Sequence, residues 1–216
     1  MIYQDYYLDL LEIDRWRLRV LSNSADQIPD EWPLLEKAVI NCQACDLHKT
    51  RTQTVFGTGN RQADMMFIGE APGAEEDRQG KPFVGRAGQL LTEMLRAIGL
   101  SRDEVYIANI LKSRPPGNRD PQVSEVSACM PFLQQQIKLI QPKLLVALGR
   151  TAAQNLLKTT VSLSRLRGQN LFFNEIPLLV TYHPAYLLRT PQDKVKAYED
   201  LKRIQKIMMS KLRVKC

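Results

Sequence analysis

The feature that most constrains the fold is an alternation of short apolar runs with longer amphipathic stretches across residues 64–209. The apolar runs have the length of buried strands, and the amphipathic stretches repeat apolar side chains at helical spacing. Such alternation is typical of a parallel sheet with helices on both faces. We therefore predict an α/β protein with a central, mostly parallel, four-stranded sheet. Its strands are expected near residues 64–69, 105–108, 143–148 and 178–182, and helices near 34–40, 85–98, 124–140, 151–157 and 194–209.

The N-terminal segment differs in charge from the rest of the chain. Residues 1–40 hold four Lys/Arg and eight Asp/Glu, whereas residues 189–216 hold nine Lys/Arg and three Asp/Glu. The segment begins with an amphipathic stretch, and its polar part, residues 22–33, contains two prolines, which favour a linker. We predict a helical arm and linker over residues 1–30 and one domain over residues 31–216.

Composition and charge constrain the cellular compartment and the binding partners of this protein. The longest aliphatic run, Leu144–Leu148, is far shorter than the ~20 apolar residues that span a bilayer. The N-terminus carries acids where a signal peptide needs basic residues. We therefore expect a cytoplasmic protein that does not enter a membrane, and as a separate expectation we take it to be a monomer. The net charge of +7 and the basic C-terminal tail favour a nucleic-acid partner, although a solvated basic helix face explains them equally well.

Polar residues follow three of the predicted strands. Glu70, Asn109 and His183 each stand where an apolar run ends. In parallel α/β sheets, ligands bind outside the carboxyl ends of the strands, so these side chains are expected to share one pocket. Each residue alone also has a structural interpretation: a solvated turn acid, an Asn that satisfies backbone groups, or a buried histidine.

The chemistry of these residues suits a planar, polar ligand. Phe83, between Pro82 and Val84-Gly85, can present its ring to a base or can cap a helix within the core. The Asn109 amide matches the N3–H and O4 edge of uracil and other amide-like edges. His183 can donate to a developing oxyanion, and a carboxylate at Glu70 can orient water or stabilise a cation.

Two further stretches carry groups that can contact nucleic acid. Arg114 and Arg119 lie in a Pro- and Gly-rich loop and can hold phosphates, or they can be ordinary solubilising charges. Tyr186, Leu187 and Leu188, shortly after His183, can wedge into a base stack, or His183 can simply be a buried structural histidine. The spacing of Cys42-x-x-Cys45 indicates metal binding or redox chemistry, with chance as an equal alternative.

Taken in order, these motifs resemble the family 4 uracil-DNA glycosylases, the iron–sulfur branch of that superfamily. The resemblance covers about residues 34–206 and leaves the acidic arm outside. It implies a three-layer α/β/α sandwich that hydrolyses the N-glycosidic bond of uracil in DNA and leaves an abasic site. Its carriers are Cys42-x-x-Cys45, GEAPGAEED at 69–77, GKPFVGRAG at 80–88, YIANILKSRPPGNRDP at 106–121, Cys129, ALGRTA at 147–152 and HPAYLLR at 183–189.

The resemblance also implies roles for single residues. Phe83 would stack on the flipped uracil, Asn109 would read its polar edge, and His183 would stabilise charge at uracil O2. Glu70 and Ala71 would lie beside the deoxyribose, with Ala71 where a related branch has a water-activating Asp. Glu70 and Glu76 are the candidate catalytic carboxylates. The expected DNA contacts are Arg86, Arg114, Arg119, Tyr186, Leu187 and Arg189.

The resemblance also implies a metal site, but one of its four ligand positions differs from the family pattern. Family members hold a [4Fe–4S] cluster on four cysteines, and Cys42, Cys45 and Cys129 match three of them. Ser113 stands at the fourth position, where a serine alkoxide is a harder ligand than a thiolate. We expect a cluster held by the three cysteines plus Ser113 or an exogenous ligand. A labile three-cysteine cluster, a zinc site completed by His48 and no metal are the alternatives.

Two other functions fit parts of the sequence. A non-catalytic DNA-binding protein could keep this fold with an altered metal site, and a zinc-stapled module could act through the N-terminal arm. A mere binder has no need of Glu70, Phe83, Asn109 and His183 together, which favours the enzyme. A covalent uracil-binding branch of the superfamily uses an inserted histidine, and residues 70–83 contain none.

Overall fold

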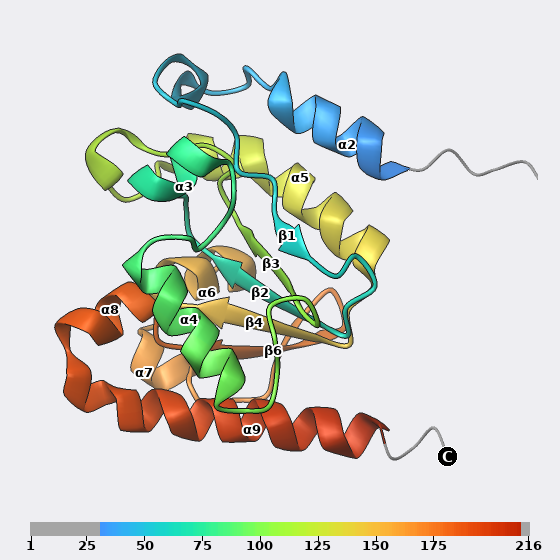
Figure 1. The fold of residues 1–216 in the computed structure, drawn as a ribbon, viewed down its shortest axis with the longest axis vertical. Coiled ribbons are helices and arrows are strands. Elements are labelled where there is room, and N and C mark those ends of the chain that lie inside the picture. Colours follow the sequence, from blue (N-terminus) through green and yellow to red (C-terminus); the bar gives the residue numbers. More distant parts are fainter. Residues whose placement is uncertain (1–30, 213–216) are drawn as a thin grey trace, which may run out of the picture. The chain divides into compact units, whose positions relative to one another are not determined.

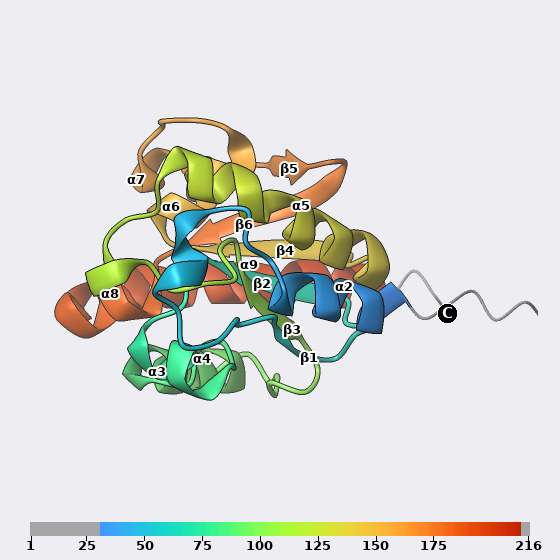
Figure 2. The ribbon, with the colours of Figure 1, turned by 90° about the horizontal axis from the view of Figure 1, so that it is seen from above.

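The computed structural model describes residues 31–212 and, within them, a six-stranded sheet in the order β1-β3-β2-β4-β6-β5. The four inner strands are parallel neighbours, and β1 and β5 pair antiparallel at the two edges. Figure 2 shows the strands in this order from one edge to the other. The strands are β1 (Thr58–Gly59), β2 (Met65–Gly69), β3 (Tyr106–Asn109), β4 (Leu144–Leu148), β5 (Leu171–Phe173) and β6 (Ile176–Thr181).

The predicted count of four strands was therefore wrong, although the four predicted strands are all present as the parallel core. The two additional strands are two and three residues long. Segments this short carry no readable alternation of apolar and polar residues. They extend the edges of the sheet without changing the position of the carboxyl ends that matter for a site.

Helices cover both faces of the sheet, which confirms the three-layer α/β/α sandwich. In Figure 1, α2 and α5 lie above the strands and α9 lies below them, and α4 packs in the same apolar cluster as α9. The helices are α2 (Glu31–Ile40), α3 (Ala74–Gln79), α4 (Arg86–Arg96), α5 (Val123–Ile140), α6 (Arg150–Leu157), α7 (Leu163–Leu166), α8 (Pro184–Arg189) and α9 (Lys194–Leu212). Three short 3₁₀ segments are η1 (Asp46–Lys49), η2 (Pro116–Asn118) and η3 (Pro191–Asp193).

The inner strands are buried on both sides, as a parallel sheet between helices requires. Alternate side chains of β2 serve the two layers: Met66 and Ile68 pack with α2, α5 and α6, whereas Met65 and Phe67 pack with α4 and α9. Each side of the sheet thus has its own apolar cluster. The sheet between them is a rigid platform for residues at its carboxyl edge.

The start of the domain differs slightly from expectation. Helix α2 begins at Glu31, so residues 31–33 of the predicted linker are helical, with Pro33 in the first turn, where proline is tolerated. The Trp32 ring anchors this turn against Phe56, with ring centroids 6.0 Å apart. The predicted arm over residues 1–30 lies outside the described residues. None of the helices in the described part of the chain is long and apolar enough to cross a membrane.

Candidate active site

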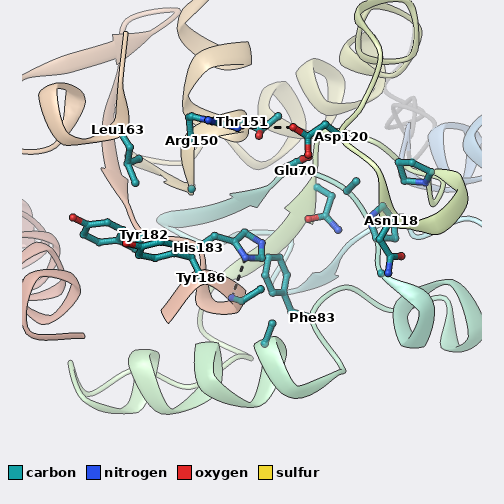
Figure 3. Close-up of a pocket in the computed structure, with 18 of the residues that line it drawn as sticks. Glu70, Phe83, Asn118, Asp120, Arg150, Thr151, Leu163, Tyr182, His183 and Tyr186 are labelled. Atoms are coloured by element: carbon teal, nitrogen blue, oxygen red, sulfur yellow. Dashed lines mark hydrogen bonds and ion pairs between the residues drawn. The ribbon is translucent and has the colours of Figure 1, made fainter. Parts of the chain in front are cut away.

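The carboxyl ends of the inner strands deliver polar side chains to one pocket of about 880 Å³ (Figure 3). Glu70 directly follows β2, Asn109 ends β3, and His183 is the second residue after β6; all three line this pocket. Phe83 lines it from the loop between α3 and α4. The sequence-based expectation of one shared pocket therefore matches the geometry.

Two glycines allow these side chains to approach each other. A Cβ added at Gly69 would overlap Asn109 Oδ1 and lie 2.6 Å from Phe83 Cζ. Gly149, after β4, has φ +92°, and a Cβ there would lie 2.8 Å from His183 Cβ. Any larger residue at either position would push the ring, the amide or the imidazole out of place.

Phe83 forms the apolar wall of the pocket. Its side chain is buried, and its ring centroid lies 5.6 Å from that of His183 at an interplanar angle of 34°. The backbone of Phe83 adopts φ +53°, a left-handed conformation that a bulky residue rarely adopts. Strain of this kind persists only where the surroundings hold it, and it is found most often at functional sites.

Glu76 holds the Phe83 loop by its backbone. Its Oε1 accepts hydrogen bonds from the Val84 and Gly85 amides at 2.9 and 3.0 Å, and its Oε2 accepts from Gly73 N at 3.2 Å. Both carboxylate oxygens are therefore engaged. This geometry favours a positioning role for Glu76 and leaves Glu70 as the better candidate for a reacting carboxylate.

Asn109 carries an unpaired acceptor. The residue is buried, and its Oδ1 is the single buried side-chain oxygen or nitrogen in the described residues that lacks a hydrogen-bond partner. Leaving such an atom unsatisfied costs about 1–3 kcal/mol. The backbone of Asn109 is fixed, because the buried Lys112 Nζ donates to its carbonyl at 2.8 Å. Because Asn109 lines the pocket, this oxygen is a candidate acceptor for a ligand N–H.

His183 is set up as a neutral hydrogen-bond donor. It caps the N-terminus of α8, and its Nδ1 accepts from Ala185 N at 3.1 Å, which assigns the ring proton to Nε2. Burial, with a smaller contribution from Arg189, lowers the pKa of His183 from 6.5 to about 4. At neutral pH the imidazole is therefore uncharged, and its Nε2–H remains available.

This lowered pKa makes a prediction about stability. Between about pH 6.5 and pH 4, His183 binds a proton in the unfolded chain and not in the folded one, so folding is disfavoured as the pH falls through this window. We expect His183→Gln, which cannot titrate, to lose less unfolding free energy than the wild type between pH 7 and pH 4.5. Urea unfolding of both proteins at each pH measures the difference, and equal losses would contradict the lowered pKa.

Glu70 lies in a second polar group on the opposite side of the pocket from Phe83. Burial raises the pKa of Glu70, a hydrogen bond from Thr151 opposes the rise, and the charge of Asp120 adds to it. Arg150 Nη2 lies 3.8 Å from Asp120 Oδ2, and Figure 3 shows these four side chains together. A carboxylate with a raised pKa and a neighbouring hydroxyl suits the activation of water.

Sequence reasoning missed Asp120, Arg150 and Thr151. The signal was present, because Arg150 and Thr151 follow Gly149 at the carboxyl end of β4. The same rule that selected the ends of β2, β3 and β6 applies to this fourth strand. The far wall, formed by Ser162, Leu163 and Ser164, has no such signal.

The arginines expected to contact DNA differ in whether they line the pocket. Arg119 and Arg189 line the pocket, whereas Arg86 and Arg114 do not. Arg119 is tied to the buried Glu125, with Nη2 and Oε1 2.6 Å apart, and Arg114 Nε donates to Asn118 Oδ1 at 2.7 Å. Both bonds give shape to the loop that leads from β3 to α5.

The predicted apolar wedge needs a correction. Leu187 is 1% exposed and packs in the cluster with α4 and α9, so its side chain is not available to a base stack. The exposed leucine of α8 is Leu188. Tyr186 lines the pocket, but its hydroxyl donates to Asp193 Oδ2 at 2.6 Å and its ring stacks on Tyr182 at 5.3 Å.

The residues of the expected metal site form a different set of contacts. Ser113 is buried, and its Oγ accepts from Arg51 Nη1 at 2.9 Å. The other end of the same guanidinium, Nη2, donates to the carbonyls of Cys42 and Ile40 at 2.9 and 3.0 Å. Arg51 thus ties the end of α2 and the first cysteine to the loop after β3.

This donor set does not fit a four-thiolate cluster. It offers three thiols, Cys42, Cys45 and Cys129, and one hydroxyl that is already bonded to a guanidinium. Within the described residues, no three His, Cys, Asp or Glu side chains form a group that could hold a metal ion. The zinc alternative has no support for the same reason, because His48 joins no such group within the described residues.

Comparison with known proteins decides the family. A family model described as the uracil DNA glycosylase superfamily matches residues 56–202, which include every pocket residue discussed above. The chain belongs to this superfamily. Its fold is therefore that of this superfamily, and the resemblance drawn from the motifs is confirmed.

The similarity to individual proteins points to one branch of this superfamily. The chain is 46% identical over 176 residues to a type-4 uracil-DNA glycosylase of Archaeoglobus fulgidus. The matched residues make up 78% of this chain and 88% of that protein. A type-4 uracil-DNA glycosylase of Thermotoga maritima is 44% identical over 165 residues, or 76% of this chain and 86% of that protein. A type-4 uracil-DNA glycosylase of Sulfurisphaera tokodaii is 41% identical over 190 residues, which are 84% of this chain and 86% of that protein.

Proposed function

We propose that this chain removes uracil from DNA by hydrolysing the N-glycosidic bond, leaving an abasic site. Its relatives bear the name of that activity. The observation that carries the proposal is the unpaired Asn109 Oδ1, which shares a pocket with the Phe83 ring and the neutral His183. A planar base with an N–H beside a carbonyl satisfies all three groups at once.

Binding comes first in the proposed mechanism. A base within a duplex must be flipped out of the stack, at a cost of a few kcal/mol. Stacking on the Phe83 ring returns about 1–3 kcal/mol. Asn109 Oδ1 accepts from uracil N3–H, and its amide nitrogen donates to O4. These contacts offset the flipping cost and orient the base.

Bond cleavage follows from the charges in the pocket. As the bond between C1′ and N1 breaks, positive charge develops on the sugar and negative charge on the base. His183 Nε2–H donates to uracil O2 and stabilises the departing anion. Glu70 stabilises the sugar cation, orients the water that attacks C1′ and accepts the proton that this water releases, which then neutralises the departed base anion. Ala71, half-buried in the pocket wall, offers no group for this task.

The rim of the pocket supports contact with the DNA backbone. Arg119 and Arg189 are exposed and line the pocket, so they can reach the phosphates that flank a flipped nucleotide. Arg86 is exposed at the start of α4, next to the Phe83 loop. Uracil-containing DNA, single- or double-stranded, is the proposed substrate.

A single-turnover assay with excess enzyme tests the proposal. The probes are oligonucleotides that carry one uracil, with matched thymine and cytosine strands as controls. We expect release of uracil and an alkali-labile abasic site in the uracil strand only. Tight binding without base release would instead support the non-catalytic DNA-binding alternative.

Iron content tests the metal site separately. The family name of the relatives suggests a cluster, which three thiols and a hydroxyl do not fit. We expect Ser113→Cys to raise the iron and acid-labile sulfide bound per chain, because a thiolate is a softer ligand than a hydroxyl. Ser113→Ala, which removes one of the three acceptors of Arg51 and adds no thiol, is the matched control. Equal iron in the wild type and Ser113→Cys would contradict this.

A further inference from the structure

The Phe83 loop lines two hollows, although the Phe83 ring itself is buried in the apolar cluster with α4 and α9. One side faces the pocket described above, and the other faces a second pocket of about 360 Å³, which Phe83 and Val84 also line. The strained conformation of Phe83, with φ +53°, therefore lies between two hollows. Hydrogen bonds to the loop backbone add to this packing and help to hold the strained conformation.

Those bonds come from both sides of Phe83 along the chain. Glu76 accepts from the two amides that follow Phe83. Before Phe83, the carbonyl of Pro82 accepts from Arg102 Nη2 at 2.9 Å. Arg102 lies between α4 and β3, nineteen residues after Phe83 in the sequence, and lines the second pocket. It holds the loop from outside the uracil pocket.

Arg102 is also anchored on α4. Its Nη1 lies 3.4 Å from Thr92 Oγ1, and that hydroxyl donates to the carbonyl of Gly88 at 3.1 Å. Gly88 packs so closely on the loop that a Cβ there would overlap the Phe83 carbonyl. The guanidinium, the helix and the loop thus form one connected unit.

Ion pairing does not explain why this cation is half-buried. In the part of the chain that the structure describes, no salt bridge to Arg102 is formed. Burial lowers the pKa of its guanidinium, so the site disfavours the charge it contains. The shorter of its two hydrogen bonds goes to the Pro82 carbonyl, which is part of the loop that carries the stacking ring.

We propose that Arg102 is a positioning residue that fixes Phe83 in the conformation that stacks on the flipped base. The inference rests on the proposed function, because it concerns the ring that would hold uracil. Arg102 itself touches neither the base nor the uracil pocket. Its effect on excision must pass through Phe83.

A double-mutant cycle tests this dependence. The proteins are the wild type, Phe83→Leu, Arg102→Met and the double variant, and the measurement is the single-turnover excision rate at saturating enzyme. We expect Arg102→Met to slow excision about tenfold in the wild type, since a small misplacement of a binding group has effects of this order. In the Phe83→Leu background the same change should alter the rate less than about twofold. A factor of about two is the scatter expected when the effects of two independent substitutions are added.

Three further measurements separate positioning from other roles. The salt dependence of DNA binding should be the same for the wild type and Arg102→Met, because a lost phosphate contact would reduce its slope. Arg102→Lys, which can still donate one bond to the Pro82 carbonyl, should recover part of the rate. Arg96→Met, which removes an exposed arginine of α4 paired within its own helix, should leave the rate unchanged.

The outcomes are distinct. Equal losses from Arg102→Met with and without Phe83, or a reduced salt slope, would overturn the positioning role. If Arg102→Met does not fold, the cycle is run with Arg102→Lys, and additive losses have the same meaning. Absence of excision by the wild type would instead reject the proposed function, and excision unaffected by Phe83→Leu would reject the stacking assignment.

Discussion

Replacing His183 by alanine is expected to slow single-turnover excision of uracil by about 10²–10³-fold, the loss typical of removing one donor to a developing oxyanion. The imidazole is neutral at physiological pH because burial lowers its pKa to about 4, and its Nε2–H is free because Nδ1 is occupied by Ala185 N. A neutral donor stabilises the leaving base without carrying a full charge in the ground state. Affinity for DNA should change little, because the interaction strengthens only as the bond breaks.

The pH profile gives this prediction a second readout. If the neutral imidazole acts as donor, the wild-type rate should show no inflection near 6.5, the ordinary pKa of histidine. His183→Gln retains an N–H donor and should recover part of the loss seen with alanine. Because His183 also caps α8, thermal unfolding of each variant must accompany the rates. A loss below about tenfold, or an equal loss of DNA affinity, would remove His183 from the chemical step.

The sequence predicts the frame of the site well because one rule governs it. Parallel strands are buried on both faces, so they appear as continuous apolar runs, and the residues after them stand at the edge where ligands bind. Glu70, Asn109 and His183 follow directly from this. The rule was not applied to β4, and Arg150 and Thr151 were missed for that reason alone.

Other parts of the site depend on contacts that no local pattern records. Glu76 bonds to amides eight and nine residues further along the chain, so its role follows from the path of the loop and not from its neighbours. In α8, Leu187 and Leu188 are adjacent, and only packing against α4 decides which one is buried. Arg51 meets Ser113 across 62 residues, a pairing that neither motif suggests.

Asn109→Asp is expected to lower uracil excision by about 10²–10³-fold and to raise the relative excision of cytosine. Buried polar groups left mismatched reject a ligand by factors of this size or larger. An ionised carboxylate offers acceptors only, so one oxygen would face uracil O4 without a hydrogen between them. The Asn109 site is 2% exposed, and burial of this kind raises the pKa of a carboxyl group.

In its protonated form, the carboxyl group that Asn109→Asp introduces would instead suit cytosine. Its hydroxyl donates to cytosine N3, and its carbonyl oxygen accepts from the N4 amino group. Cytosine excision by the variant should therefore rise as the pH falls, whereas uracil excision should not. Asn174→Asp, an exposed change in the turn between β5 and β6, is the matched control and should leave both rates unchanged. An unchanged ratio of uracil to cytosine excision would show that Asn109 does not read the base, even though its Oδ1 is buried in the pocket without a partner.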